Sequence, residues 1–135
     1  MGQLVDSSVF IHIERRASEG NLIEVLEGRQ LLAIAAVSIS ELLVGVHRTD
    51  SPARALRRQR FVETILENVS VEPFDLAVAE THSQLWAELV SQGQLIPAHD
   101  LQIADTALAH GYDLLTYDLR DFKRVPSLVV EQPPS

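Results

Sequence analysis

The sequence opens with Met1-Gly2-Gln3-Leu4-Val5-Asp6-Ser7-Ser8-Val9, and this stretch decides the fold. The apolar pair Leu4-Val5 ends at Asp6, two serines follow, and a helical pattern begins at Ser8. We interpret it as a β-strand that passes directly into a helix and leaves one carboxylate at its carboxyl end. Ligands of open parallel sheets bind at that edge. The next question is therefore which other acids follow strands.

Along the rest of the chain, short apolar runs alternate with helical patterns, which indicates βαβ units and a mainly parallel sheet. Right-handed crossovers would place helices on both faces of this sheet. We expect further strands at 31–37, 69–71, 114–116 and 128–130, and helices at 8–15, 19–27, from 38, from 52, from 75 and at 100–110.

The length of 135 residues predicts a single domain over 1–135, with a short Pro-rich tail at 131–135. The chain has no cysteine, which excludes a disulfide framework, a thiolate zinc site and a cysteine nucleophile. It shows no signal peptide, and no apolar run approaches the roughly 20 residues of a membrane helix. We therefore expect a cytoplasmic protein without a membrane contact.

The formal net charge is −8, whereas general nucleic-acid binders are usually basic. A metal-dependent nuclease escapes this argument, because cations neutralise the acids of its site and a local basic patch can hold the substrate. Arg54, Arg57 and Arg58 share a stripe of the helix that starts after Ser51-Pro52. This stripe is a candidate contact for RNA or for a protein partner, and the alternative is a solvated helix face.

Four acids lie at a strand-to-helix transition or in the first turn of a helix, and each has a local explanation. Asp6 could cap the helix that follows it. Glu41 completes a capping box with Ser38, in which Glu reaches back to the backbone N–H of the cap. Asp100 suits the dipole of the helix it opens, and Asp118 could cap the next helical turn.

Taken together, the four acids predict a metal site, because these transitions share one edge of a parallel sheet. Two carboxylates about 4 Å apart repel by about 4 kcal/mol at an effective dielectric of 20. Such a cluster persists only with a cation or with raised pKa values. Oxygen ligands without cysteine favour Mg²⁺ or Mn²⁺. Gly45, one turn after Glu41, would leave room there for a metal ion or a substrate.

Four motifs occur in order along the chain: Asp6-Ser7-Ser8, Ser40-Glu41-Leu42-Leu43-x-Gly45, Asp100-x-x-Ile103-Ala104 and Thr116-x-Asp118-x-x-Asp121-Phe122. In this order and at these intervals they resemble the PIN domain, and within it the VapC-type ribonuclease toxins of bacterial toxin–antitoxin pairs. The resemblance covers nearly the whole chain. It implies a three-layer α/β/α sandwich with a mainly parallel central sheet.

The resemblance also implies a Mg²⁺- or Mn²⁺-dependent endoribonuclease that hydrolyses RNA, with transfer and ribosomal RNA as expected targets. Its partners would be a VapB-like antitoxin and a second copy of the chain. The family's metal-binding acids correspond to Asp6, Glu41, Asp100 and Asp118. Supporting positions correspond to Ser8 and Thr116, which would orient carboxylates, and to Asp121, an additional nearby acid.

Two residues near the motifs remain open at this point. The family usually has a small residue at the position of Asp105, which lies about 140° around a helix from Asp100. We interpret Asp105 as a surface residue, with an outer acid of the site as the alternative. Among the histidines, only His99 is next to a motif acid, and a histidine in a polar loop is more often incidental.

Two other classes of function compete with the nuclease. A receiver-like signalling module would hold Mg²⁺ beside a phospho-accepting Asp, but it needs a Lys at a late strand end, and Lys123 follows Asp121-Phe122 instead. A non-enzymatic scaffold would tolerate loss of the acids, yet none is missing. Cleavage of structured DNA is the alternative within the nuclease class.

Overall fold

The fold is built on a five-stranded sheet in which every described strand pair is parallel. The computed structural model describes residues 2–16 and 31–133, so the helix predicted at 19–27 lies outside the described residues. The strand order is β3-β2-β1-β4-β5. The strands are β1 (Gln3–Val5), β2 (Leu32–Ala35), β3 (Ser70–Glu72), β4 (Asp113–Leu115) and β5 (Val130–Glu131). The predicted parallel sheet is thus confirmed, although Glu131, which the sequence assigned to the tail, pairs with Leu115.

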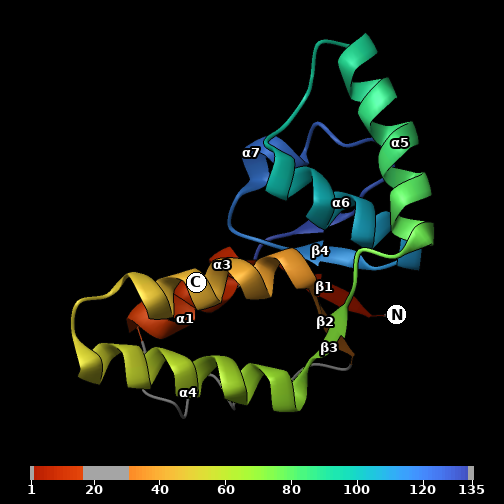
Figure 1. Cartoon of the computed structure of the whole chain (residues 1–135). Coiled ribbons are helices and arrows are strands. Elements are labelled where there is room, and N and C mark those ends of the chain that lie inside the picture. The colour runs from red at the N-terminus through yellow and green to blue at the C-terminus, as the bar shows by residue number, and fades with distance from the viewer. Residues whose placement is uncertain (1, 17–30, 134–135) are drawn as a thin grey trace.

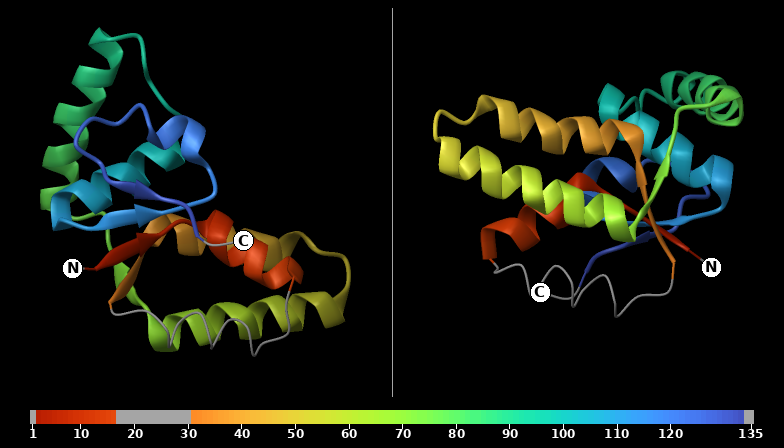
Figure 2. Two further views of the ribbon diagram at one scale, coloured as in Figure 1. Left: turned by 180° about the vertical axis from the view of Figure 1, so that it is seen from behind. Right: turned by 60° about the horizontal axis from the view of Figure 1, so that its bottom comes forward.

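Helices cover both faces of the sheet, as the predicted three-layer sandwich requires (Figure 1). They are α1 (Ser7–Arg16), α3 (Ala36–Arg48), α4 (Pro52–Asn68), α5 (Leu76–Ser91), α6 (Ala98–His110) and α7 (Leu119–Phe122). In Figures 1 and 2, α1, α3 and α4 lie on one side of the strands, and α5, α6 and α7 lie on the other.

Alternation along the strands divides the apolar side chains between two cores. Leu4 and Leu114 belong to the core under α5, α6 and α7, whereas Val5 and Leu115 belong to the core under α1, α3 and α4. All four are at most 2% exposed. Such runs, apolar on both faces, are typical of parallel strands.

Capping residues confirm three of the predicted helix boundaries. The Ser51 side chain accepts a hydrogen bond from the Arg54 backbone N–H at the start of α4. The Asp75 carboxylate accepts one from the Val78 backbone N–H at 3.0 Å at the start of α5. Gly111 ends α6 in the left-handed conformation, with φ of 71°, which glycine adopts without steric cost.

The start of α3 differs from the prediction. The strand β2 ends at Ala35 and the helix begins at Ala36, two residues earlier than expected. Ser38 therefore lies inside the first turn, where it is fully buried and its hydroxyl has no hydrogen-bond partner among the described residues. The predicted capping box of Ser38 and Glu41 is wrong, and Glu41 is left available for other contacts.

None of the helices in the described part of the chain has both the length and the apolar character needed to cross a membrane.

Candidate metal centre

Five acids reach the carboxyl edge of the sheet from four different segments. Asp6 follows β1, Glu41 lies in α3 just after β2, Asp100 lies in the first turn of α6, and Asp118 and Asp121 follow β4 at the start of α7. The connections from β1 to α1, from β2 to α3 and from β4 to α7 are short, which places Asp6, Glu41 and Asp118 at this edge, whereas Asp100 reaches it from α6, which follows α5 in the chain. Their convergence on one edge is what the order of motifs predicted.

The tightest part of this group consists of Asp100, Asp118 and Asp121. Each is half-buried and offers a carboxylate oxygen, and these oxygens all lie within 4.8 Å of one another. The Asp121 carboxyl group is close enough to contribute to the raised pKa of Asp100. In residues 2–16 and 31–133, no Arg or Lys forms an ion pair with any of the three. Asp121, which the sequence placed only nearby, thus belongs to the tightest cluster.

Asp6 is held in place by a hydroxyl network that joins the ends of β1 and β4. Its side chain is nearly buried, and its Oδ2 accepts a hydrogen bond of 2.8 Å from the Thr116 hydroxyl. The Thr116 oxygen accepts one of 2.9 Å from the Asp118 backbone N–H. Because Thr116 has donated its only proton to Asp6, the Ser8 hydroxyl at 3.3 Å must be the donor of their shared contact.

Ser8 completes the network by accepting a hydrogen bond of 3.1 Å from the Tyr117 backbone N–H. The Thr116 hydroxyl therefore has no further bonding capacity, since one proton is donated and two lone pairs are occupied. A hydroxyl whose donor and acceptor positions are all occupied restricts the orientation of the groups bonded to it. Ser8 and Thr116 accordingly lie where they can orient Asp6 and the backbone that carries Asp118.

Glu41 lies beside Asp6 and has two polar neighbours that the sequence reasoning did not pair with it. The Ser7 hydroxyl donates to Glu41 Oε1 at 3.3 Å, and His99 Nδ1 lies 3.8 Å from Oε2. His99 is thus in contact with an acid of the site, although it remains 58% exposed. Its position next to Asp100 in the sequence was the only signal for this contact.

The proposed role of Gly45 does not hold. The Gly45 carbonyl oxygen accepts a hydrogen bond of 2.7 Å from Arg58 Nη1, and a Cβ built on Gly45 would have this same Arg58 atom as its neighbour at 3.9 Å. The glycine therefore faces α4 rather than a space for a metal ion. Close packing of α3 on α4 explains this residue better.

Crowding and burial raise the pKa values of several of these acids. Burial, followed by the charges of Asp118, Asp6 and Asp121, raises the pKa of Asp100 to about 7. Burial and the charges of Asp121 and Asp6 also raise the pKa of Asp118. Burial and the charge of Asp6 raise the pKa of Glu41, while His99 and Ser7 act in the opposite direction. Protons or a cation must therefore compensate the negative charge of this site near neutral pH.

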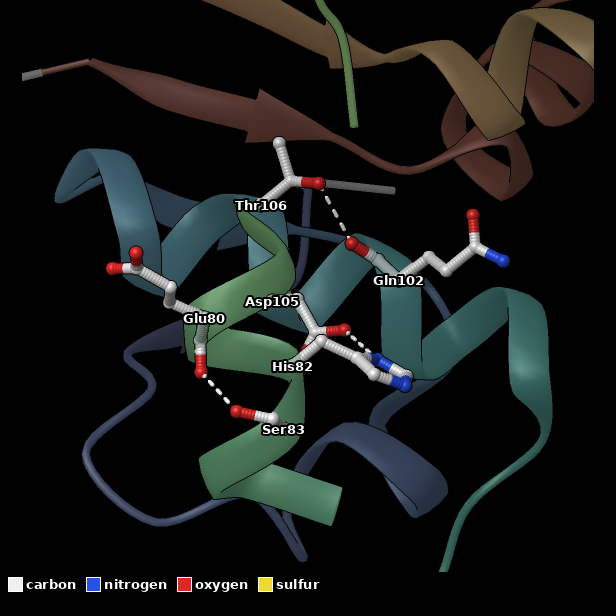
Figure 3. Close-up of polar contacts among 6 residues, drawn as sticks. All are labelled: Glu80, His82, Ser83, Gln102, Asp105 and Thr106. Carbon is white, nitrogen blue, oxygen red and sulfur yellow. Dashed lines mark hydrogen bonds and ion pairs between the residues drawn. The ribbon is translucent and has the colours of Figure 1, made fainter. Parts of the chain in front are cut away.

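Asp105 is not a surface residue, so the favoured sequence interpretation was wrong. Its side chain is fully buried, and Oδ2 lies 2.5 Å from His82 Nδ1 on the neighbouring helix α5 (Figure 3). The alternative of an outer acid of the metal site also fails, because the contact is made on the side of α6 that faces α5. The spacing from Leu101 to Asp105, four residues along the apolar face, is a signal that sequence reasoning could have used.

The three arginines of α4 differ in their surroundings. Arg58 is half-buried, bonded to the Gly45 carbonyl and paired with Glu14 of α1 at 3.6 Å. It holds α1, α3 and α4 together. Arg54 and Arg57 are exposed to solvent and remain available for a partner.

Comparisons with known proteins agree with this fold. The model of the PIN domain matches residues 4–128. Ribonuclease VapC1 of Rickettsia felis is 31% identical, over 96% of this chain and 95% of its own. The tRNA(fMet)-specific endonuclease VapC of Shigella flexneri is 31% identical over 74% of both chains. The DNA-bound VapBC structure from Salmonella typhimurium superposes with a TM-score of 0.82, at 25% identity and with 98% of both chains covered.

Proposed function

The chain belongs to the PIN domain family and, within it, to the VapC ribonucleases, and from this premise we propose that it is the endoribonuclease toxin of a toxin–antitoxin pair. Its reaction is the hydrolysis of RNA phosphodiesters at the acidic edge of the sheet. The family match over residues 4–128 supports one domain over 1–135. Neither the receiver-like module nor the scaffold has an observation in its favour.

One observation carries the proposal: three carboxylate oxygens gather within 4.8 Å at an edge where four segments meet. This donor set fits a divalent cation, since Mg²⁺ and Mn²⁺ prefer oxygen ligands and none of these three acids forms an ion pair in the described part of the chain. We assign Asp100, Asp118 and Asp121 to the cation, with Asp6 beside them. Glu41 is the fifth acid of the site, at the side of Asp6.

The other polar side chains of the site have two roles, which are to orient the acids and to accept a proton. Thr116 and Ser8 hold Asp6 in a fixed orientation, and Ser7 does the same for Glu41. Glu41 accepts the proton of the attacking water, for which a raised pKa is favourable. When bound, the divalent ion supplies a lowered water pKa and neutralises charge that develops on the phosphate. In-line attack by water that breaks the bond from phosphorus to the 3′-oxygen leaves a 5′-phosphate and a 3′-hydroxyl.

The test is cleavage of RNA by the purified protein in Mg²⁺ or Mn²⁺, in EDTA, and with Asp6→Asn or Asp100→Asn. We expect cleavage in either metal and a loss of at least about 10²-fold with EDTA or either substitution, because orienting the reacting groups contributes that much or more. A protein that cleaves equally well with EDTA and with both substitutions would show that the carboxylates do no chemistry.

For the substrate we propose structured RNA, with transfer and ribosomal RNA as the first candidates. The Shigella flexneri relative is named as an endonuclease specific for the transfer RNA tRNA(fMet). Exposed Arg54 and Arg57 on α4 offer positive charge to the RNA backbone. The target can be identified by expressing the wild type and Asp100→Asn separately and sequencing the new RNA 5′ ends in each case. Ends that appear only with the wild type mark its cleavage sites. Ends that appear equally with both proteins would contradict cleavage by this site.

For partners we propose a VapB-like antitoxin and a second copy of the chain, acting in the cytoplasm. The Salmonella typhimurium structure, similar over 98% of both chains, is a VapBC complex with DNA. Co-expression with the product of a neighbouring small gene, followed by light scattering of the purified material, tests both. A monomer that captures no such product would contradict them.

A further inference from the structure

The contact between His82 and Asp105 lies away from the five acids of the site and has no part in the proposed reaction. Figure 3 shows His82 on α5 directed toward Asp105 on α6. His82 Nδ1 lies 2.5 Å from Asp105 Oδ2. The His82 side chain is 35% exposed, whereas the Asp105 side chain is completely buried.

Burying a carboxylate with so few hydrogen bonds costs free energy of folding. Asp105 Oδ1 has no hydrogen-bond partner in the described part of the chain, where His82 is therefore the only hydrogen-bond partner of this carboxylate. Burial raises the pKa of Asp105 to about 6, and the hydrogen bond and charge of His82 act against that rise. An apolar residue at this position would avoid the desolvation cost altogether. Stability alone therefore does not explain why a hydrogen-bonded polar pair occupies this position.

Among the side-chain contacts of α6 with α5, the hydrogen bond between His82 and Asp105 is the directional one in the described part of the chain. Besides Asp105 and Thr106, the buried residues of α6 are the apolar Leu101, Ile103, Ala104 and Ala107. Apolar packing is non-directional, and two of these four side chains are single methyl groups. A hydrogen bond is directional, so the contact of Asp105 with His82 restricts the rotation of α6 against α5 more sharply than the methyl groups do.

The rotation of α6 matters because Asp100 lies in the first turn of the same helix. Asp105 is about 140° around the helix axis from Asp100 and about 7.5 Å along it. One side of α6 is therefore anchored on α5, while another side presents its carboxylate to Asp118 and Asp121. Turning or sliding the helix would move both groups together.

We propose that His82 and Asp105 are positioning residues, whose hydrogen bond fixes α6 on α5 and so holds Asp100 within reach of Asp118 and Asp121. The inference rests on the proposed function in that it names what keeps the proposed metal ligand in place. Its structural part, the anchoring of α6, stands on the contact itself.

The decisive variant is the double substitution His82→Leu with Asp105→Leu in the full chain. Replacing a buried polar pair by apolar groups is often neutral or stabilising, so the thermal unfolding temperature should stay at or above that of the wild type. Affinity for Mn²⁺, measured by titration calorimetry, should nevertheless fall by about tenfold or more, the range found when groups that orient metal ligands are removed. Amide hydrogen exchange at 99–104 should become faster.

Three further variants separate positioning from general stability. His82→Asn keeps a donor near the Nδ1 position and should retain Mn²⁺ affinity within about threefold of wild type, whereas His82→Leu alone should lose it. Leu89→Ala, in the core under α5, should lower the unfolding temperature by creating a cavity. It should leave Mn²⁺ affinity unchanged where the protein is folded. Ser83→Ala, an exposed position on α5, should change neither.

A stable double variant with wild-type Mn²⁺ affinity and unchanged exchange at 99–104 would overturn the proposal. If the double variant does not fold, equal Mn²⁺ affinity of His82→Asn and His82→Leu would overturn it instead. Failure of the wild type itself to bind Mn²⁺ would count against the proposed function alone, because hydrogen exchange would still report on the anchoring of α6.

Discussion

Among single residues, the buried carboxylate of Asp105 gives the clearest pH dependence outside the site. Burial raises its pKa from 3.8 to about 6 in the folded protein. The folded state therefore binds this proton more tightly than the unfolded state does. Raising the pH from about 4 to about 6 must then lower the free energy of unfolding, with no further loss from this group above that range.

Replacement by a neutral amide removes this dependence. Relative to Asp105→Asn, the wild type should lose on the order of 2 kcal/mol of unfolding free energy between pH 4 and pH 7. Denaturant unfolding of both proteins at a series of pH values measures the difference, in which the effects of groups that do not interact with Asp105 cancel. Parallel pH profiles for the two proteins would show that Asp105 titrates as it does in the unfolded chain.

Thr116 supports a second prediction for a single residue. Thr116→Val keeps the shape of the side chain but removes the donor to Asp6 and the acceptor for the Asp118 backbone N–H. Removing groups that orient metal ligands typically reduces activity or metal affinity by about 10- to 100-fold. RNA cleavage and Mn²⁺ titration should both show a loss in this range.

The matched control is Thr106→Val. Thr106 is also buried, but its hydroxyl donates only to the Gln102 carbonyl oxygen within α6. We expect cleavage and Mn²⁺ affinity close to those of the wild type. An equal loss in both threonine variants would indicate general destabilisation rather than orientation of Asp6.

At the scale of elements, the sequence was most informative where a local signal marks a boundary. Ser51, Asp75 and Gly111 each act through the backbone of their own helix, so the boundaries they mark could be read without tertiary information. The start of α3 had no such signal, because an apolar run continues from the strand into the helix and Ser38 resembled a cap. Apolar runs of this kind do not distinguish a strand end from a buried helix start.

The site shows the same division between local and tertiary information. The acids could be placed at one edge because parallel strands share that edge, but their contacts depend on how helices pack. Ser7 with Glu41 and His82 with Asp105 join residues 34 and 23 positions apart. No periodicity in one segment encodes such pairs. Gly45 was misread for the same reason, since its neighbour Arg58 belongs to another helix.

A cap also allows a prediction at the scale of one helix. Asp75→Ala removes the acceptor for the Val78 backbone N–H at the start of α5 and should lower the free energy of unfolding by about 1 kcal/mol. Asp75→Ser, which can still accept this bond, should recover most of the loss. Denaturant unfolding measures both variants. RNA cleavage under folding conditions should be unchanged, because the acidic edge is built without Asp75.

For the whole molecule, the acidic edge concentrates repulsion in a chain whose formal net charge is already −8. The raised pKa of Asp100, about 7, means that the folded protein without a cation holds a proton there that the unfolded chain releases near pH 4. Without a divalent ion, raising the pH through this range should therefore lower the unfolding temperature. Net self-repulsion acts in the same direction.

A divalent ion should reverse this loss, since a ligand that binds only the folded state stabilises it by about 2.7 kcal/mol at 100 times its dissociation constant. Thermal unfolding in EDTA and in excess Mn²⁺ at pH 5 and pH 8 tests this expectation. The stabilisation should be larger at pH 8, because at pH 5 the ion competes with the proton on Asp100. Asp100→Asn should show little stabilisation at either pH. Equal stabilisation of wild type and variant would place the bound ion away from this edge of the sheet.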